Sequence, residues 1–71
     1  MHGETVLVTI NGDRRTMPAG MTVERLLERL EAAPAGIAVA KNGHVVQRSS
    51  FGSERIDDGD RIEIIKAVAG G

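Results

Sequence analysis

The sequence predicts an α+β fold in which one main helix packs on a mixed sheet of about five strands. Three features carry this prediction: short alternating segments rich in β-branched residues, tight Asn-Gly turns between them, and a single stretch with helical periodicity. With 71 residues and no internal repeat or linker, the chain is expected to form a single domain, residues 1–71. A hydrophobic fraction of 41% with 27% charged residues argues against disorder.

The first two strands are predicted to form a hairpin. Thr5–Ile10 alternates, so that its valines and isoleucine share one face. Asn11 and Gly12 follow, and this pair suits a type I′ turn because both central residues need positive φ. A second strand over about Arg14–Met17 then runs back, and Pro18 ends it because proline cannot donate to a strand ladder.

One helix is predicted after this hairpin. Thr22 is a suitable N-cap, and Met21 and Leu26 stand at the two positions of a hydrophobic staple. Pro34 and Gly36 are expected to end the helix. The apolar stripe at helical spacing, which predicts the face that lies on the sheet, consists of Val23, Leu26, Leu27 and Leu30.

The middle of the chain predicts a second hairpin and a loop. Ile37–Ala40 is short and apolar and is bounded by turn residues, as in a buried central strand. The Asn42-Gly43 pair predicts another tight turn, from which His44–Gln47 returns as a strand. The segment Arg48–Ser53 is expected to be a loop with Phe51 as its buried anchor.

The last strand begins after the Asp57–Asp60 turn and is expected to be central. Ile62 and Ile64 share one of its faces, and Ile65 lies on the other, less buried face. The resulting order, ββαβββ, is that of a β-grasp fold if the first and last strands lie side by side and parallel. The sequence therefore predicts a β-grasp architecture.

The closing residues, Ala67–Gly71, predict a flexible tail that carries the chain's own carboxylate. From Lys66 onward the six residues span roughly 20 Å when extended, at about 3.3 Å per residue. Gly70 and Gly71 have no Cβ, so they can pass through a narrow slot and leave the terminal carbonyl unhindered. The alternative interpretation is a frayed end without function, as is common for termini.

Composition excludes several classes of function. Nine basic and ten acidic residues give a net charge of −1, so no basic surface is available for nucleic acid. The absence of cysteine excludes disulfides, thiolate metal sites and thiol nucleophiles. His2 and His44 lack acidic residues at ligand spacing, so we expect no metal site and no bound cofactor. Without a secretory signal or a long apolar run, we expect a cytoplasmic protein with no membrane partner.

Four segments together resemble the ThiS family, the ubiquitin-like sulfur carrier proteins of thiazole (thiamine) biosynthesis. These segments are Ala19–Leu27, Val39–Val46, Asp58–Ile64 and the closing Val68–Gly71. The resemblance extends over nearly the whole chain. The Gly-Gly end and the Asp-Gly-Asp turn are also similar to the small subunit of molybdopterin synthase.

The resemblance implies a protein co-substrate rather than an enzyme. An E1-like adenylyltransferase of the ThiF type would use ATP and Mg²⁺ to adenylate the Gly71 carboxylate. A cysteine desulfurase system would then supply sulfur as a persulfide, giving a thiocarboxylate that donates sulfur to a ThiG-type thiazole synthase. Gly70, Ala69 and Val68 would form the tail that reaches the partner's active site.

Ile65 and Ala67 are the candidate partner-binding residues, because they lie where the tail leaves the domain. Alternation places Ile65 on the exposed face, where an apolar side chain can anchor a partner; the alternative is a scattered surface residue. Four functions remain open: a sulfur carrier of this or another pathway, a molybdopterin synthase subunit, a ubiquitin-like modifier of lysines, and a β-grasp binding module with an incidental Gly-Gly.

Overall fold

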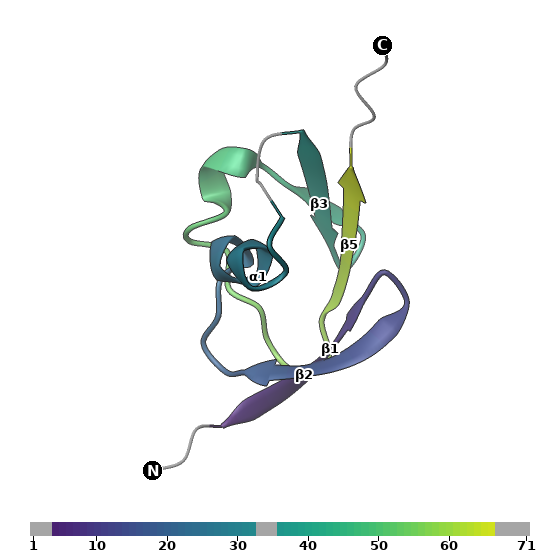
Figure 1. Cartoon of the computed structure of the whole chain (residues 1–71), viewed down its shortest axis with the longest axis vertical. Helices are drawn as coiled ribbons and strands as arrows, with labels where there is room; N and C mark the ends of the chain where they lie inside the picture. Colours follow the sequence, from purple (N-terminus) through teal and green to yellow (C-terminus); the bar gives the residue numbers. More distant parts are fainter. Residues whose placement is uncertain (1–3, 33–35, 67–71) are drawn as a thin grey trace.

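The computed structural model describes residues 4–32 and 36–66, which form a five-stranded sheet with α-helix α1 packed on one face (Figure 1). The strand order across the sheet is β2-β1-β5-β3-β4, so the last strand lies at its centre. The predicted order ββαβββ is confirmed. The elements are β1 (Thr5–Ile10), β2 (Asp13–Pro18), α1 (Val23–Arg29), β3 (Ile37–Lys41), β4 (His44–Val46), the 3-10 helix η1 (Arg48–Ser50) and β5 (Arg61–Lys66).

The pairing of β1 with β5 gives the sheet its mixed character. These two strands are parallel, with Thr9 opposite Arg61 and Ile10 opposite Ile62, whereas all other neighbouring strands are antiparallel. The sheet is strongly twisted, and the β1–β2 hairpin crosses the direction of β3 and β5 (Figure 1). A parallel pair formed by the first and last strands is the arrangement predicted for a β-grasp fold.

Both predicted Asn-Gly turns are confirmed. Asn11 and Gly12 have φ angles of 51° and 87°, and Asn42 and Gly43 have φ angles of 53° and 84°. Positive φ at both central residues is the requirement of a type I′ turn. β2 is one residue longer at each end than predicted, whereas β4 is one residue shorter, ending at Val46.

The start of α1 is also as predicted. The Thr22 hydroxyl accepts a hydrogen bond from the Arg25 amide at 3.3 Å, which is the N-cap interaction. The Val23 amide, free of any partner within the helix, donates to the Glu54 carbonyl at 2.9 Å. Met21 packs against the core beside the helix, consistent with its place in a hydrophobic staple.

The end of α1 differs from the prediction. Pro34 and Gly36 do not end the helix: it stops at Arg29, and Pro34 lies outside the described residues. Glu31 adopts a left-handed φ of 57°, and the Ala32 amide turns back to the Leu27 carbonyl at 2.9 Å. This is a Schellman motif with glutamate in the position that usually holds glycine. No helix in the described residues is long and apolar enough to cross a membrane.

Replacing Glu31 with glycine is expected to stabilise the fold. A left-handed backbone costs an L-residue about 1–2 kcal/mol, and the extra freedom of glycine in the unfolded chain removes part of that gain. We expect the Glu31→Gly variant to unfold at a temperature about 4 °C higher, measured by calorimetry. Glu28→Gly, within the helix, is the control and should lower the unfolding temperature; a decrease in both variants would contradict this account.

The core lies between α1 and the face of the sheet it covers. β3 is internal but is not buried on both faces as predicted, because Val39 is buried while Ala38 on the opposite face is exposed. β5, rather than β3, occupies the centre of the sheet. Phe51 is buried, as predicted. The buried apolar side chains are Val8, Ile10, Met17, Val23, Leu26, Leu27, Val39, Val46, Phe51, Ile56 and Ile62.

Candidate functional site

The outer face of the sheet, opposite α1, carries an apolar patch beside the end of β5. The predicted partner-binding residue Ile65 lies there with 61% of its surface exposed, and Ala38 pairs with it across β3. Ala40 and Val45, which form the next cross-strand pair, extend this surface to β4, and the exposed Glu63, which pairs with Ala40 on the β5 side, borders it. We call Ala38, Ala40, Val45 and Ile65 the outer patch.

Only Ile65 of the outer patch was singled out from the sequence. Val45 is 77% exposed, the highest value among the large apolar residues that the structure describes as exposed. The exposure of Val45 could have been predicted from the sequence. If this short strand packs on the core through Val46, alternation places Val45 on the outer face. The contribution of Ala38 and Ala40 could not be predicted without the register that places them opposite Ile65 and Val45.

The structure describes the chain as far as Lys66, the last residue of β5. The predicted tail residues Ala67, Val68, Ala69, Gly70 and Gly71 lie outside the described residues, so their assigned roles stay predictions. The last described residue, Lys66, ends the central strand and follows Ile65 of the outer patch, so the tail starts from this edge of the patch.

The Asp57–Asp60 turn is held by its own carboxylates. Asp60 is 9% exposed and accepts hydrogen bonds from the Asp57 amide at 2.7 Å and from the Asn42 carboxamide at 2.9 Å. Asp58 accepts from the Leu7 amide of β1 at 2.7 Å. Within residues 4–32 and 36–66, no group of three or more acidic or histidine side chains is arranged to hold a metal ion. These aspartates therefore stabilise the turn that precedes β5.

Lys41 joins β3 to the loop that precedes β5. Its Nζ lies 2.7 Å from Glu54 Oε2 and 3.8 Å from Asp60 Oδ2, and it donates to the Arg55 carbonyl at 2.8 Å. The hydrogen bond with Glu54 and the nearby Asp60 carboxylate raise the pKa of Lys41 above its ordinary value of 10.5, against the opposing effect of burial. Lys41 is thus a structural cation rather than a group poised for chemistry near neutral pH.

The contribution of Lys41 to the free energy of unfolding is expected to decrease at alkaline pH. Because its pKa is raised by folding, its stabilisation is complete below pH 10.5 and is lost as the pH rises through the folded-state pKa. Lys41→Met should lower the free energy of unfolding by about 1 kcal/mol at neutral pH, measured by urea denaturation. The difference in the free energy of unfolding between this variant and the unsubstituted protein should become smaller above pH 10.5. Lys66→Met, at an exposed position, is the control; equal effects of the two substitutions would refute this role for Lys41.

Comparisons with known proteins agree with this geometry. The model of the ThiS family matches residues 8–71. The sulfur carrier protein ThiS of Escherichia coli is 36% identical over 64 residues, which cover 90% of this chain and 97% of that protein. The crystal structure of the thiamine biosynthesis protein ThiS from Geobacter metallireducens superposes with a TM-score of 0.78 at 33% identity, covering 93% of this chain and all of that one.

A second group of relatives is much longer. A thiazole synthase of Paramagnetospirillum magneticum is 39% identical over 64 residues, and one of Magnetococcus marinus is 36% identical over the same length. In both cases the match covers 90% of this chain but only 20% of the relative, so the chain spans about a fifth of the length of these proteins.

The parallel central pair, the one α-helix of the described residues on one face of the sheet and the exposed outer patch beside the end of β5 define a small ubiquitin-like protein of the β-grasp class. The family match covers most of the chain, and the relative in Escherichia coli is covered almost completely. The chain belongs to the ThiS family.

Proposed function

We propose that the chain is the sulfur carrier of thiazole formation in thiamine biosynthesis, and that Gly71 is the residue that carries the sulfur. The observation that supports this most is the match to the Escherichia coli sulfur carrier over 97% of its length. In this proposal the chain is a protein co-substrate rather than an enzyme. It acts in the cytoplasm, where ATP is available to the enzyme that activates it.

The chemistry starts from a carboxylate, which is a poor acyl donor until it is activated. The Gly71 carboxylate attacks the α-phosphorus of ATP on a ThiF-type adenylyltransferase with Mg²⁺, and pyrophosphate leaves. The terminal sulfur of a persulfide, supplied by a cysteine desulfurase system, then attacks the acyl carbon and AMP leaves. A thiol reductant cleaves the resulting acyl disulfide, and the thiocarboxylate remains on Gly71.

The acceptor in this proposal is a ThiG-type thiazole synthase. The similarity of this chain to part of two proteins named thiazole synthase supports that choice over molybdopterin synthase. The absence of cysteine from the 71 residues means that no internal thiol competes for the activated acyl group. Gly70 supplies clearance in the partner's active site, and Ala67–Ala69 form the tether.

The outer patch is the surface by which partners hold the body of the domain while the tail enters their active site. Ile65 is its main anchor, because it is exposed, apolar and only two residues from the start of the tail at Ala67. Val45 extends the contact toward β4. Such a division lets the patch determine affinity and lets the tail determine whether the reaction occurs.

Intact-mass spectrometry tests the proposal. The protein is incubated with the adenylyltransferase, ATP, a cysteine desulfurase and cysteine. We expect the mass change that corresponds to replacement of the terminal OH by SH, and no change in a variant lacking Gly71 or in one with a leucine appended after it. Covalent conjugates to lysines of other proteins would instead indicate a modifier, and an unchanged mass would refute the carrier function.

A further inference from the structure

The asparagines at the two hairpin tips hold β5 from opposite sides. Asn42, at the β3–β4 tip, holds the first residue of the strand: the Arg61 amide donates to Asn42 Oδ1 at 2.9 Å, and the Asn42 amide donates to the Arg61 carbonyl at 2.8 Å. Asn11, at the β1–β2 tip, holds the fourth. The Ile64 amide donates to Asn11 Oδ1 at 2.8 Å, and Asn11 Nδ2 donates to the Ile64 carbonyl at 3.3 Å.

The bonds made by Asn11 replace strand pairing that β1 does not provide. β1 pairs with β5 only at Arg61 and Ile62, and the Asn11 amide adds a bond to the Ile62 carbonyl at 2.9 Å. Beyond that point the chain turns away into β2. The Asn11 carboxamide then offers Ile64 one acceptor and one donor, which is what the backbone of a continuing strand would offer.

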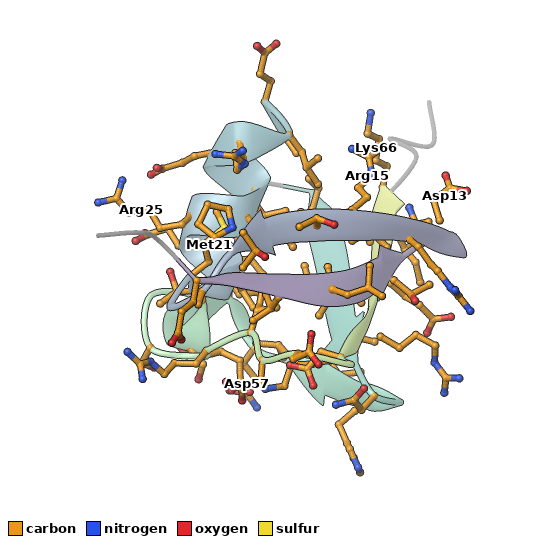
Figure 2. All side chains as sticks on the ribbon, turned by 90° about the horizontal axis from the view of Figure 1, so that it is seen from below. Asp13, Arg15, Met21, Arg25, Asp57 and Lys66 are labelled. Carbon is orange, nitrogen blue, oxygen red and sulfur yellow. The ribbon has the colours of Figure 1, made fainter. Side chains whose placement is uncertain are left out.

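The surroundings of Ile64 show that its position on the β1 side depends on the Asn11 side chain. On one side, β3 pairs with β5 as far as Lys66. On the other side, the end of β5 borders a hollow lined by Asn11, Glu31, Ile64 and Lys66, among others. Figure 2 shows Lys66 at the same end of the molecule as Arg15 and Asp13 of the β1–β2 hairpin, two further residues that line this hollow. Within the described residues, the only hydrogen bonds that hold Ile64 from the β1 side are those made by Asn11.

We propose that Asn11 is a positioning residue for the reaction: it fixes the direction of β5 at Ile64 and thereby the direction in which the tail leaves the domain. This inference rests on the proposed function, because it assigns Asn11 a role in presenting Gly71 to the activating enzyme. The tail begins at Ala67, three residues after Ile64, so a strand held at Ile64 by β3 alone lets the tail leave the domain over a wider range of directions. Ala38 of β3 still pairs with Ile65, so the outer patch still docks, but fewer docked complexes hold the carboxylate in place.

Two matched substitutions separate positioning from stability. Asn11→Gly and Asn42→Gly both keep a residue that readily adopts the positive φ of a type I′ turn, while each removes the side-chain bonds to β5. Asn42→Gly also removes the bond from Asn42 Nδ2 to Asp60, so the kinetics of both variants are compared at a temperature at which circular dichroism shows each to be folded. The readouts are the kcat and KM of the carrier for pyrophosphate release by the adenylyltransferase, and the hydrogen exchange rate of the Ile64 amide measured by NMR. Asn11→Asp retains the acceptor for the Ile64 amide but not the donor, and it serves as the conservative variant.

For Asn11→Gly we expect kcat to fall about tenfold with KM unchanged within about twofold, because a misdirected reacting group lowers the reactive fraction of bound complexes. The Ile64 amide should exchange faster in the same variant. Asn11→Asp should restore part of the kcat, and Asn42→Gly should change neither constant by more than about twofold.

Unchanged kinetics in Asn11→Gly, or an equal loss of kcat in Asn42→Gly, would overturn the inference and leave the proposed function standing. Absence of pyrophosphate release from the unsubstituted protein would instead refute the proposed function, and the role of Asn11 with it. A rise in KM alone would assign Asn11 to the docking surface and would also overturn the positioning role.

Discussion

Replacement of Asp60 by alanine is expected to lower the free energy of unfolding by about 3 kcal/mol, since it removes a buried carboxylate and leaves its partners unsatisfied. Asp60 binds the Asp57 amide and the Asn42 carboxamide, and it lies 3.8 Å from Lys41 Nζ. It therefore ties the turn before β5 to the β3–β4 hairpin. A domain of this size has only a few kcal/mol in reserve, so much of the Asp60→Ala population should be unfolded at physiological temperature.

The measurement is urea denaturation followed by circular dichroism, with Asp57→Ala as the matched control. Asp57 lies in the same turn, but its side chain is exposed (Figure 2) and makes no hydrogen bond with the described residues. We expect Asp57→Ala to change the free energy of unfolding by no more than about 0.5 kcal/mol. Similar losses in both variants would show that the net charge of the turn, rather than the hydrogen bonds of Asp60, stabilises it.

Introduction of a charge into the outer patch is expected to impair docking without unfolding the domain. The Ile65→Asp variant should raise the KM for adenylation about 30-fold, equivalent to ~2 kcal/mol of lost binding. A charged side chain that replaces Ile65 in the contact must be desolvated without a partner. Because Ile65 is 61% exposed, the core is not disturbed and the unfolding temperature should change little. Steady-state kinetics and calorimetry provide the two readouts.

Leu7→Asp is the control for this substitution. Leu7 is also exposed on the outer face, but it precedes the β1 residue that pairs with the start of β5. By register it lies six residues back along the strand direction from Ile65, or roughly 20 Å at about 3.3 Å per residue. We expect the KM of the Leu7→Asp variant for adenylation to stay within about twofold of that of the unsubstituted protein. An equal rise for both variants would mean that the whole face, rather than the outer patch, contacts the enzyme.

Local signals in the sequence were sufficient for most of the fold. The two Asn-Gly turns, the Thr22 cap and the alternation of β5 were predicted because each depends on the backbone preferences or spacing of residues close together in the chain. The end of α1 was predicted wrongly because no such local signal is present there. Glutamate is not a usual left-handed residue, so the Schellman motif at Glu31 has no signal in the sequence, and the later Pro34 was taken as the stop.

The candidate site depends on contacts between distant segments, which the sequence did not reveal. Asn11 was interpreted as a turn residue only, yet its side chain binds Ile64, 53 positions away. Lys41 and Asp60 were not linked, because their proximity depends on the register of β3 against β5. The exposure of Ile65 was predicted from alternation and is confirmed, whereas its companions in the outer patch required the strand order.

Sulfur transfer in a reconstituted reaction tests the central claim most directly. The chain is first converted to its thiocarboxylate with isotopically labelled sulfur and purified, and is then mixed with a thiazole synthase and that enzyme's other substrates. We predict that the label moves into the thiazole and that the mass of the chain returns to that of the free carboxylate. A thiazole that forms without the label, or a thiocarboxylate that persists while thiazole accumulates, would contradict the assignment of Gly71 as the sulfur donor.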